Sequence, residues 1–281
     1  LVSRTARGSR STNAQSLIAL RGSHSIIPHI LEYRESFKIQ STYVQPLQKS
    51  LGKDGRLRTE FIQTGTATGR LSSKSPNLQN IPQESIWAKD LRSAFIAPDG
   101  FSFLAFDYSQ LELRILAALS EDAKMVKAFE EGQDIHQITA SRVLKIPLSK
   151  VTAEERRLAK TLNFGLIYGM GASAFSKTSG LDRKDAQEFI NTYFEEFPKI
   201  RDWQEKTKNE ARALGYVQTL TGRRRFLLGL SSSSLEFVAD AERAAINQPI
   251  QGLGADILKM AMIKIRELLE GAQIGPGAAK M

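Results

Sequence analysis

Apolar and polar residues alternate with a period that changes along this chain of 281 residues. Residues 14–20 and 26–48 place apolar side chains at helical spacing, which predicts two helices. Ser11, Thr12 and Asn13, directly before the first helix, are residue types that cap helix N-termini. Residues 57–61 alternate as strands do, and residues 66–82, rich in Gly, Ser, Pro and Asn, predict a loop. We therefore expect the first third of the chain to be mainly helix and loop.

A short apolar run, Phe101–Phe106, stands in the middle of the chain. Its length and its aromatic residues suit a strand buried on both faces better than a helix, and residues 91–96 predict a second strand. The run ends at Asp107, and from Gln110 the spacing becomes helical. A carboxylate at the exposed end of a buried strand can hold a hard cation, with the backbone carbonyl of Tyr108 as a further oxygen ligand. It can equally cap the helix that follows.

The second half of the chain has a mainly helical pattern, in residues 132–144, 154–171 and 172–230 and again near the C-terminus. Thr152 precedes the second of these stretches, and Glu155 follows three residues later, which is the spacing of a capping box. The C-terminal helix is expected to bury one row of apolar side chains: Leu258, Ala261, Ile265 and Leu268.

The helix predicted at residues 154–171 carries an unusual set of side chains at intervals of four: Arg156, Lys160, Phe164 and Tyr168. On a helix of 3.6 residues per turn, an interval of four drifts by about 40° per step, so all four stay within about 120°. Two cations suit a triphosphate, and a phenyl ring can pack on a sugar and a base. Most stripes of this kind are simply the solvated side of an amphipathic helix, but the complete pattern is rarer and favours a binding face.

The composition is that of a globular protein, with 41% hydrophobic and 25% charged residues. Cysteine is absent, which excludes a disulfide framework and a thiolate metal site and fits a reducing compartment such as the cytoplasm. No apolar run approaches the roughly 20 residues of a membrane span, and the N-terminus does not resemble a signal peptide. We therefore expect no membrane association.

The net charge is +9, and the basic excess is concentrated near the N-terminus. Residues 1–60 contain ten Lys and Arg against four Asp and Glu, which is most of the surplus in about a fifth of the chain. Such an excess favours a polyanionic partner such as nucleic acid. A solvated basic surface without a partner explains it equally well.

Several segments resemble family A DNA polymerases, the DNA polymerase I family. They are DYSQLELR at 107–114, the pattern R-x3-K-x3-F-x3-YG at 156–169, TATGRLSSKSPNLQNIP at 66–82 and AERAAINQPIQGLG at 241–254. The segments occur in the order of that family, and the resemblance covers roughly residues 12–281. It implies an α+β fold of the right-hand polymerase type, with a palm sheet. The expected parts are a partial thumb and its connector at 1–48, palm at 49–120 and 238–281, and mostly helical fingers at 121–237.

The resemblance also implies roles for individual residues. Asp107, with the Tyr108 carbonyl, is expected to bind the two catalytic Mg²⁺ ions, and Lys160 to donate a proton to the leaving pyrophosphate. The expected nucleotide-binding residues are Gln110, Glu112, His136, Arg156, Lys160, Phe164 and Tyr168. Glu112 is expected to close the sugar pocket against a ribose 2′-hydroxyl. The expected DNA-binding residues are Arg70, Asn77, Gln79, Arg243, Asn247 and Gln251. A lone histidine on a helix, such as His136, is otherwise more often structural.

The implied activity is template-directed DNA synthesis, in which deoxynucleoside triphosphates are added to a primer 3′-hydroxyl by two-metal-ion phosphoryl transfer. We expect a monomeric, nucleoid-associated cytoplasmic enzyme that binds primer-template DNA. The His-Asp-Glu hairpin that carries the second catalytic aspartate of the family is missing, so we expect a fragment that is inactive alone. We also expect exposed apolar surface around Phe103 and Leu104.

Two other functions remain open from the sequence. A single-subunit RNA polymerase shares the hand and the Arg/Lys helix, but it needs space for the 2′-hydroxyl where this chain has Glu112. A nucleic-acid-binding module without catalytic activity is the other alternative, and the presence of both Asp107 and Lys160 disfavours it for the parent protein.

Overall fold

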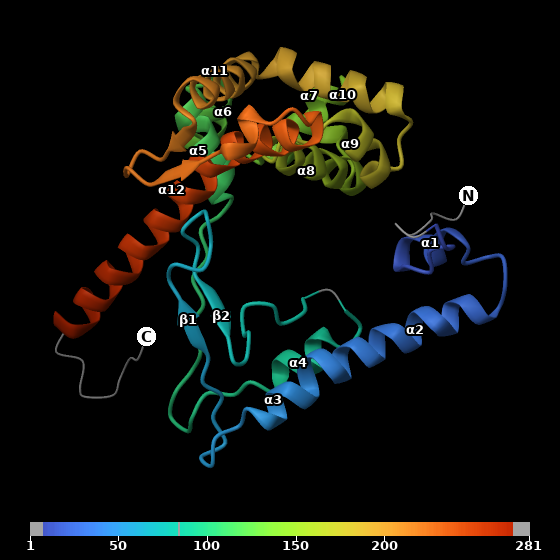
Figure 1. The fold of residues 1–281 in the computed structure, drawn as a ribbon, viewed down its shortest axis with the longest axis vertical. Helices are drawn as coiled ribbons and strands as arrows, with labels where there is room; N and C mark the ends of the chain where they lie inside the picture. Colours follow the sequence, from blue (N-terminus) through green and yellow to red (C-terminus); the bar gives the residue numbers. More distant parts are fainter. Residues whose placement is uncertain (1–7, 84, 272–281) are drawn as a thin grey trace. The chain divides into compact units, whose positions relative to one another are not determined.

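The computed structural model describes residues 8–83 and 85–271 of the 281. Arg4 and Arg7 of the basic N-terminal excess, and the C-terminal residues from 272 onward, lie outside the described residues. The chain divides into two compact units. The first unit is Leu1–Gln63 with Leu71–Ala105, and the second is Thr64–Arg70 with Phe106–Met281 (Figure 1).

The first unit contains the helices predicted for the N-terminal region, together with one later helix that was not predicted. They are α1 (Ala14–Ala19), α2 (Ile26–Lys38), a π-helix (Ile39–Val44), α3 (Gln45–Lys49) and α4 (Ala88–Ser93). Asn13 caps α1, because its Oδ1 accepts a hydrogen bond of 2.8 Å from the Ser16 amide. The helix predicted at residues 26–48 is confirmed as an almost continuous run of α2, the π-helix and α3.

Two short antiparallel strands, β1 (Glu60–Ile62) and β2 (Ser72–Lys74), complete the first unit. Glu60 is paired with Lys74, and their side chains form an ion pair of 3.1 Å. The strand expected near residue 60 is therefore present. Its partner β2 lies inside the segment that was predicted to be loop, because its Ser-Ser-Lys sequence carries no apolar alternation.

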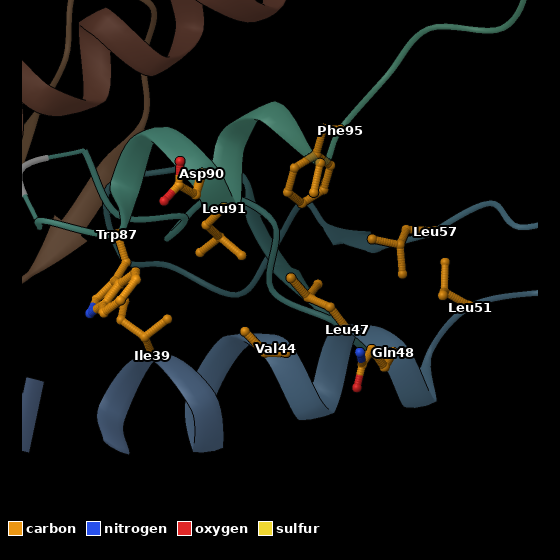
Figure 2. A pocket seen from close by; sticks show the side chains of 11 residues that line it. Ile39, Val44, Leu47, Gln48, Leu51, Leu57, Trp87, Asp90, Leu91 and Phe95 are labelled. Atoms are coloured by element: carbon orange, nitrogen blue, oxygen red, sulfur yellow. The ribbon is translucent and has the colours of Figure 1, made fainter. Parts of the chain in front are cut away.

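The strand predicted at residues 91–96 is wrong, because most of this stretch belongs to α4 or its C-terminal cap. Trp87, Leu91 and Phe95 are spaced by four residues, so a helical turn brings them to one side. Figure 2 shows these side chains facing the π-helix and α3 across an apolar groove of about 400 Å³. The groove is also lined by Ile39, Val44, Leu47, Leu51 and Leu57.

The buried strand predicted at Phe101–Phe106 is wrong as well. These residues have no regular secondary structure, and Phe103, Leu104 and Phe106 are 70%, 80% and 85% exposed. A strand needs a neighbour for its backbone N–H and C=O groups, and no strand of the described residues pairs with this segment. The expectation that apolar surface around Phe103 and Leu104 is exposed is confirmed.

Helices dominate the second unit. They are α5 (Leu111–Ser120), α6 (Ala123–Glu130), α7 (Ile135–Leu144), α8 (Ala153–Ile167), α9 (Ala172–Ser179), α10 (Arg183–Glu196), α11 (Pro198–Leu214) and α12 (Leu235–Gly271). Two 3-10 turns (Leu148–Lys150 and Leu228–Ser231) and the antiparallel pair β3 (Tyr216–Gln218) and β4 (Arg224–Phe226) complete the unit. With two small sheets among the described residues, the α+β prediction is confirmed as a helix-rich fold.

One hydrophobic core holds helices α5 to α10 and the nearer parts of α11 and α12 together. Its largest side chains that are almost completely buried are Tyr193, Phe175 and Phe197. Burial raises the pKa of the Tyr193 hydroxyl, since ionisation would place a charge in apolar surroundings. No helix within the described ranges is long and apolar enough to cross a membrane.

The C-terminal half of α12 projects away from the other helices of its unit (Figure 1). Leu258, Ile265 and Leu268, which were predicted to be buried, are exposed, and Leu268 is 61% exposed. The prediction is wrong because a helical apolar row is buried only where another element covers it, and Gly252 and Ala255 are the last buried residues of α12.

Gln248 is a polar residue in the interior of α12. Its side chain is completely buried, and neither Nε2 nor Oε1 has a hydrogen-bond partner among the described residues. Pro249 follows it, and proline cannot donate a backbone hydrogen bond inside a helix. Removing this amide from water costs free energy that no hydrogen bond to a described residue offsets.

We predict that Gln248→Met raises the free energy of unfolding by about 1–3 kcal/mol, because methionine fills a similar volume without unpaired polar atoms. Gln204→Met is the matched control, since the buried Gln204 donates a hydrogen bond of 3.0 Å to the Leu166 carbonyl. That variant should lose stability. Urea denaturation of both variants measures the difference, and an equal loss in both would contradict the prediction.

Candidate functional site

The helix α8 begins at the capping box that its sequence predicts. Thr152 Oγ1 accepts a hydrogen bond from the Glu155 amide at 3.3 Å, and the Glu155 carboxylate accepts one from the Thr152 amide at 2.7 Å. The bond from the Thr152 amide lowers the pKa of Glu155. The helix ends at Ile167, so Tyr168 is its C-cap rather than a fourth member of the helical face.

The predicted binding residues of α8 have different surroundings. Arg156 is half-exposed and forms an ion pair of 2.7 Å with Asp134. Lys160 is exposed and forms no ion pair within the described part of the chain. Phe164 is half-buried, and its ring lies 5.7 Å from that of His136. The helix thus presents one cation held by a carboxylate and, one turn later, a second cation open to solvent.

Asp134 connects α7 to α8. Its Oδ1 caps α7 by accepting from the amides of His136 and Gln137 at 2.9 and 3.1 Å, and its Oδ2 accepts from Arg156 Nε. Partial burial opposes ionisation of Asp134, but the hydrogen bond from Arg156 and those from the two amides outweigh it, so the pKa lies below its usual range. One carboxylate therefore fixes both the start of α7 and the position of Arg156.

His136 is 2% exposed, and its Nδ1 lies 2.9 Å from Asn163 Nδ2. Burial lowers the pKa of His136 to about 4; Asp134 opposes this shift, and the positive charges of Arg156 and Lys160 add to it. Sequence reasoning missed Asn163. The available signal was a polar side chain in the buried row of α8, between Ala159, Leu162 and Leu166.

The Glu112 carboxylate joins three segments that are distant in sequence. One oxygen accepts a hydrogen bond from Arg70 Nη2, and the other accepts one from the Tyr168 hydroxyl. The Glu112 side chain is 14% exposed. Burial, together with the bond to Glu112, raises the pKa of Tyr168 to about 12, against the effect of Arg70. Gln110, another predicted nucleotide-binding residue, stands directly before α5 in a left-handed conformation.

The segment that carries Arg70 packs against a second ion pair, which Arg223 forms with Asp256. Gly69 has a φ of +81°, and a Cβ atom there would lie 2.5 Å from Arg223 Cζ. Asp256 holds Arg223 in this position through a hydrogen bond of 2.6 Å. Burial opposes ionisation of Asp256, while the bonds from Arg223 and Thr221 keep its pKa below the usual range. The Asp256 carboxylate therefore has a structural role, because it accepts hydrogen bonds from Arg223 and Thr221.

The predicted metal ligands, Asp107 and Tyr108, are both exposed. In the part of the chain that the structure describes, no group of three His, Cys, Asp or Glu residues is arranged to hold a metal ion. Glu242, an acid on α12, accepts a hydrogen bond from Arg212.

The predicted DNA-binding residues occur in both units. Arg243, Asn247 and Gln251 are spaced by four on α12 and share one side of it. Arg243 is exposed and forms an ion pair with Asp240, while Asn247 and Gln251 are half-buried. In the first unit, the exposed Asn77 and Gln79 are joined by a hydrogen bond of 3.0 Å from the Gln79 amide to Asn77 Oδ1.

The family model described as DNA polymerase family A matches residues 2–281. The chain belongs to this family. DNA polymerase I of Thermus aquaticus, a thermostable enzyme, is 49% identical over 264 residues, which are 94% of this chain and 32% of that protein. DNA polymerase I of Deinococcus radiodurans is 47% identical over 264 residues, 94% of this chain and 28% of that protein.

A solved family A structure has the same fold. It is the POL domain of Pol1 from M. smegmatis in complex with DNA primer-template and dNTP. The two structures superpose with a TM-score of 0.90 at 39% identity, covering 96% of this chain and 48% of the other. The chain spans about a third of the length of the curated family A relatives given above.

We predict that Gly69→Ala destabilises the second unit by about 1–3 kcal/mol, because the new methyl group would displace Arg223 from Asp256. Gly180→Ala is the matched control, since Gly180 has a similar φ of +80° and open space around it. Thermal or urea denaturation compares the two variants. The excess loss at Gly69 should disappear in an Arg223→Ala background, and equal losses without that background would contradict the prediction.

We predict that His136 makes the second unit less stable as the pH falls from about 6.5 to about 4. Its folded pKa is about 4 against an ordinary 6.5, so within this window the unfolded chain binds a proton that the folded chain does not. The slope is at most about 1.4 kcal/mol per pH unit. Above 6.5 and below 4, the contribution no longer changes.

Urea denaturation at pH 5 and pH 7 tests this prediction, with the fluorescence of Trp203 followed in a Trp87→Phe background. His136→Asn keeps an acceptor near the position of Nδ1 but does not titrate, so it should lose part of the pH dependence. His29→Asn removes an exposed histidine and should retain it. The same pH dependence in all three proteins would show that His136 is not protonated on unfolding.

Proposed function

We propose that this chain is part of a template-directed DNA polymerase, which adds deoxynucleoside triphosphates to the 3′-hydroxyl of a DNA primer. The observation that supports this proposal most strongly is the position of the Glu112 carboxylate, which accepts hydrogen bonds from Arg70 and from Tyr168 at the end of α8. Membership of DNA polymerase family A supports the proposal, as does the likeness to a polymerase domain solved with DNA primer-template and dNTP.

Arg156, Lys160 and His136 are the groups that we assign to the triphosphate, with Lys160 as the proton donor to the leaving pyrophosphate. An exposed ammonium with no ion pair among the described residues is available for both tasks. Phe164 is assigned to the sugar and base, one turn further along α8. Glu112 is assigned to the exclusion of a 2′-hydroxyl, since its two hydrogen bonds keep the carboxylate from swinging aside.

Primer-template DNA is assigned to Arg70, Asn77, Gln79, Arg243, Asn247 and Gln251. Minor-groove acceptors occur on every base pair, so Arg, Asn and Gln donors can test the shape of a pair without reading its sequence. The net charge of +9 supports a polyanionic partner. Arg70 serves two roles in this proposal, because it also bonds Glu112 and so links the primer-template side of the site to the sugar pocket.

Family A polymerases use divalent metal ions, and we propose two Mg²⁺ ions for this activity, with Asp107 and the Tyr108 carbonyl as ligands from this chain. Mg²⁺ prefers oxygen ligands, and both groups are exposed. We expect residues 1–281 alone to show no nucleotide addition, because a pair of Mg²⁺ ions needs more oxygen ligands than one carboxylate and one carbonyl.

We propose the right-hand architecture for the parent polymerase, with partial thumb at 1–48, palm at 49–120 and 238–281, and fingers at 121–237. The fold likeness to a polymerase domain supports it. All assigned residues come from one chain, so a monomer is sufficient. DNA as the substrate would place the enzyme at the nucleoid in the cytoplasm.

Sugar selection distinguishes this function from its rivals. We predict that the chain, bound to primer-template DNA, binds a deoxynucleoside triphosphate more tightly than the matching ribonucleoside triphosphate. Glu112→Ala should reduce that preference by about tenfold or more, because it removes the group that closes the pocket. Glu130→Ala, at an exposed glutamate of α6, is the control and should leave the preference unchanged.

The measurement is the dissociation constant of each triphosphate with a dideoxy-terminated primer, so that no chemistry is required. Equal affinity for both sugars in the unaltered chain would favour an RNA polymerase. DNA binding without any triphosphate binding would favour a nucleic-acid-binding module. Either result would contradict the proposed function.

A further inference from the structure

A chain of hydrogen bonds runs from the backbone of α7 to the ring of His136. Thr139 Oγ1 lies 2.8 Å from the Ile135 carbonyl oxygen, and it also lies 3.1 Å from Asn163 Nδ2 and 3.2 Å from Asn163 Oδ1. The same Nδ2 lies 2.9 Å from His136 Nδ1. Thr139 and Asn163 are completely buried. Three side chains are thus connected in the dry interface between α7 and α8.

A backbone carbonyl can only accept, so the Thr139 hydroxyl donates to Ile135 at 2.8 Å. Its oxygen then accepts from Asn163 Nδ2 at 3.1 Å, with Asn163 Oδ1 almost as near at 3.2 Å. In the orientation that the amide has here, one proton of its NH₂ group points to Thr139 Oγ1. The second proton of that NH₂ group points to His136 Nδ1, which must be unprotonated to accept it.

The other ring nitrogen, Nε2, makes no hydrogen bond to a described residue. The fully buried polar side-chain atoms without a partner in the described part of the chain belong to Tyr193, Asn247 and Gln248. Nε2 is not among them, so the small exposed area of the ring includes it. The nitrogen that is left to carry the proton is therefore the one that reaches the surface.

We propose that Asn163, whose NH₂ group lies between Thr139 and His136, is a positioning residue that fixes His136 as the neutral Nε2–H tautomer. The role rests on the proposed function, in which Nε2–H would donate a hydrogen bond to a triphosphate oxygen. A fixed donor of this kind needs no change of protonation between pH 5 and pH 8, and it adds no cation beside Arg156 and Lys160.

The charges that face His136 agree with this assignment. Asp134, at the N-cap of α7, is the one acid that acts on the ring, and it is already paired with Arg156. Arg156 and Lys160 on α8 both disfavour an imidazolium, as does burial. A second ring proton would also place two N–H groups against each other at the bond to Asn163.

The test is a ¹⁵N NMR titration of the histidine rings in the full chain. The chain contains three histidines, and His24 and His29 are exposed, so the signals of His136 are readily separated. We expect His136 to show a protonated Nε2 and an unprotonated Nδ1 from pH 5.5 to pH 8. A protonated Nδ1 in this range would overturn the proposal.

Two variants separate positioning from a merely structural role. Asn163→Asp presents only acceptors to Nδ1, so we expect Nδ1 to gain a proton and the pKa of His136 to rise by about 1–3 units. Thr139→Val keeps the shape but removes the hydroxyl, so the amide of Asn163 can turn over and a mixture of both tautomers should appear. Ring signals identical to those of the unaltered chain in both variants would overturn the proposal.

Triphosphate binding by the same proteins gives an independent result. If Nε2–H contacts a phosphate oxygen, affinity should fall at least about tenfold in His136→Phe and change its pH dependence in Asn163→Asp. Unchanged affinity in both variants, with the tautomer reversed in Asn163→Asp, would overturn the contact to phosphate while the tautomer assignment stands. Failure of the whole proposed function would instead appear as no triphosphate binding by the unaltered chain.

Discussion

A single carboxylate, that of Glu112, holds the candidate site together. It bonds Arg70, 42 residues earlier in the sequence, and Tyr168, 56 residues later. A carboxylate that is largely removed from water is costly unless its oxygens are paired, and removing one partner is more destabilising than replacing the whole set. The position of Arg70, the first turn of α5 and the end of α8 therefore depend on one another, and the sugar pocket proposed here is a consequence of that dependence.

The interface between α7 and α8 also buries polar side chains, and there the buried groups are neutral. Asp134 and Arg156 lie at its exposed edge, where an ion pair can remain hydrated. Inside, Thr139, Asn163 and His136 are joined by hydrogen bonds, and the Thr139 hydroxyl also donates to the Ile135 carbonyl oxygen. This arrangement buries a histidine without a charge, because ionisation would cost both solvation and a hydrogen bond.

The sequence predicted the features of the structure that are local. The capping box of α8, the cap of α1 and the face with Arg156 and Lys160 depend on residues within one or two turns. Two predictions were wrong: the buried strand at Phe101–Phe106 and the buried side of the C-terminal half of α12. Each depends on another element that covers the apolar side chains, and the residues of the segment do not specify that element. The partnership of Glu112 with Tyr168 and that of His136 with Asn163 required the packing of whole helices, so spacing alone could not reveal them.

The most direct test of this account is a double-mutant cycle between Glu112→Gln and Tyr168→Phe, measured by urea denaturation of the second unit. Tyr168→Phe removes the donor of the hydrogen bond. Glu112→Gln keeps the shape but leaves one amide oxygen in place of two carboxylate oxygens, so Arg70 and Tyr168 no longer have an acceptor each. If the carboxylate organises the site, the two losses of stability should be coupled by about 1 kcal/mol or more. Losses that add within about 0.5 kcal/mol would contradict the account.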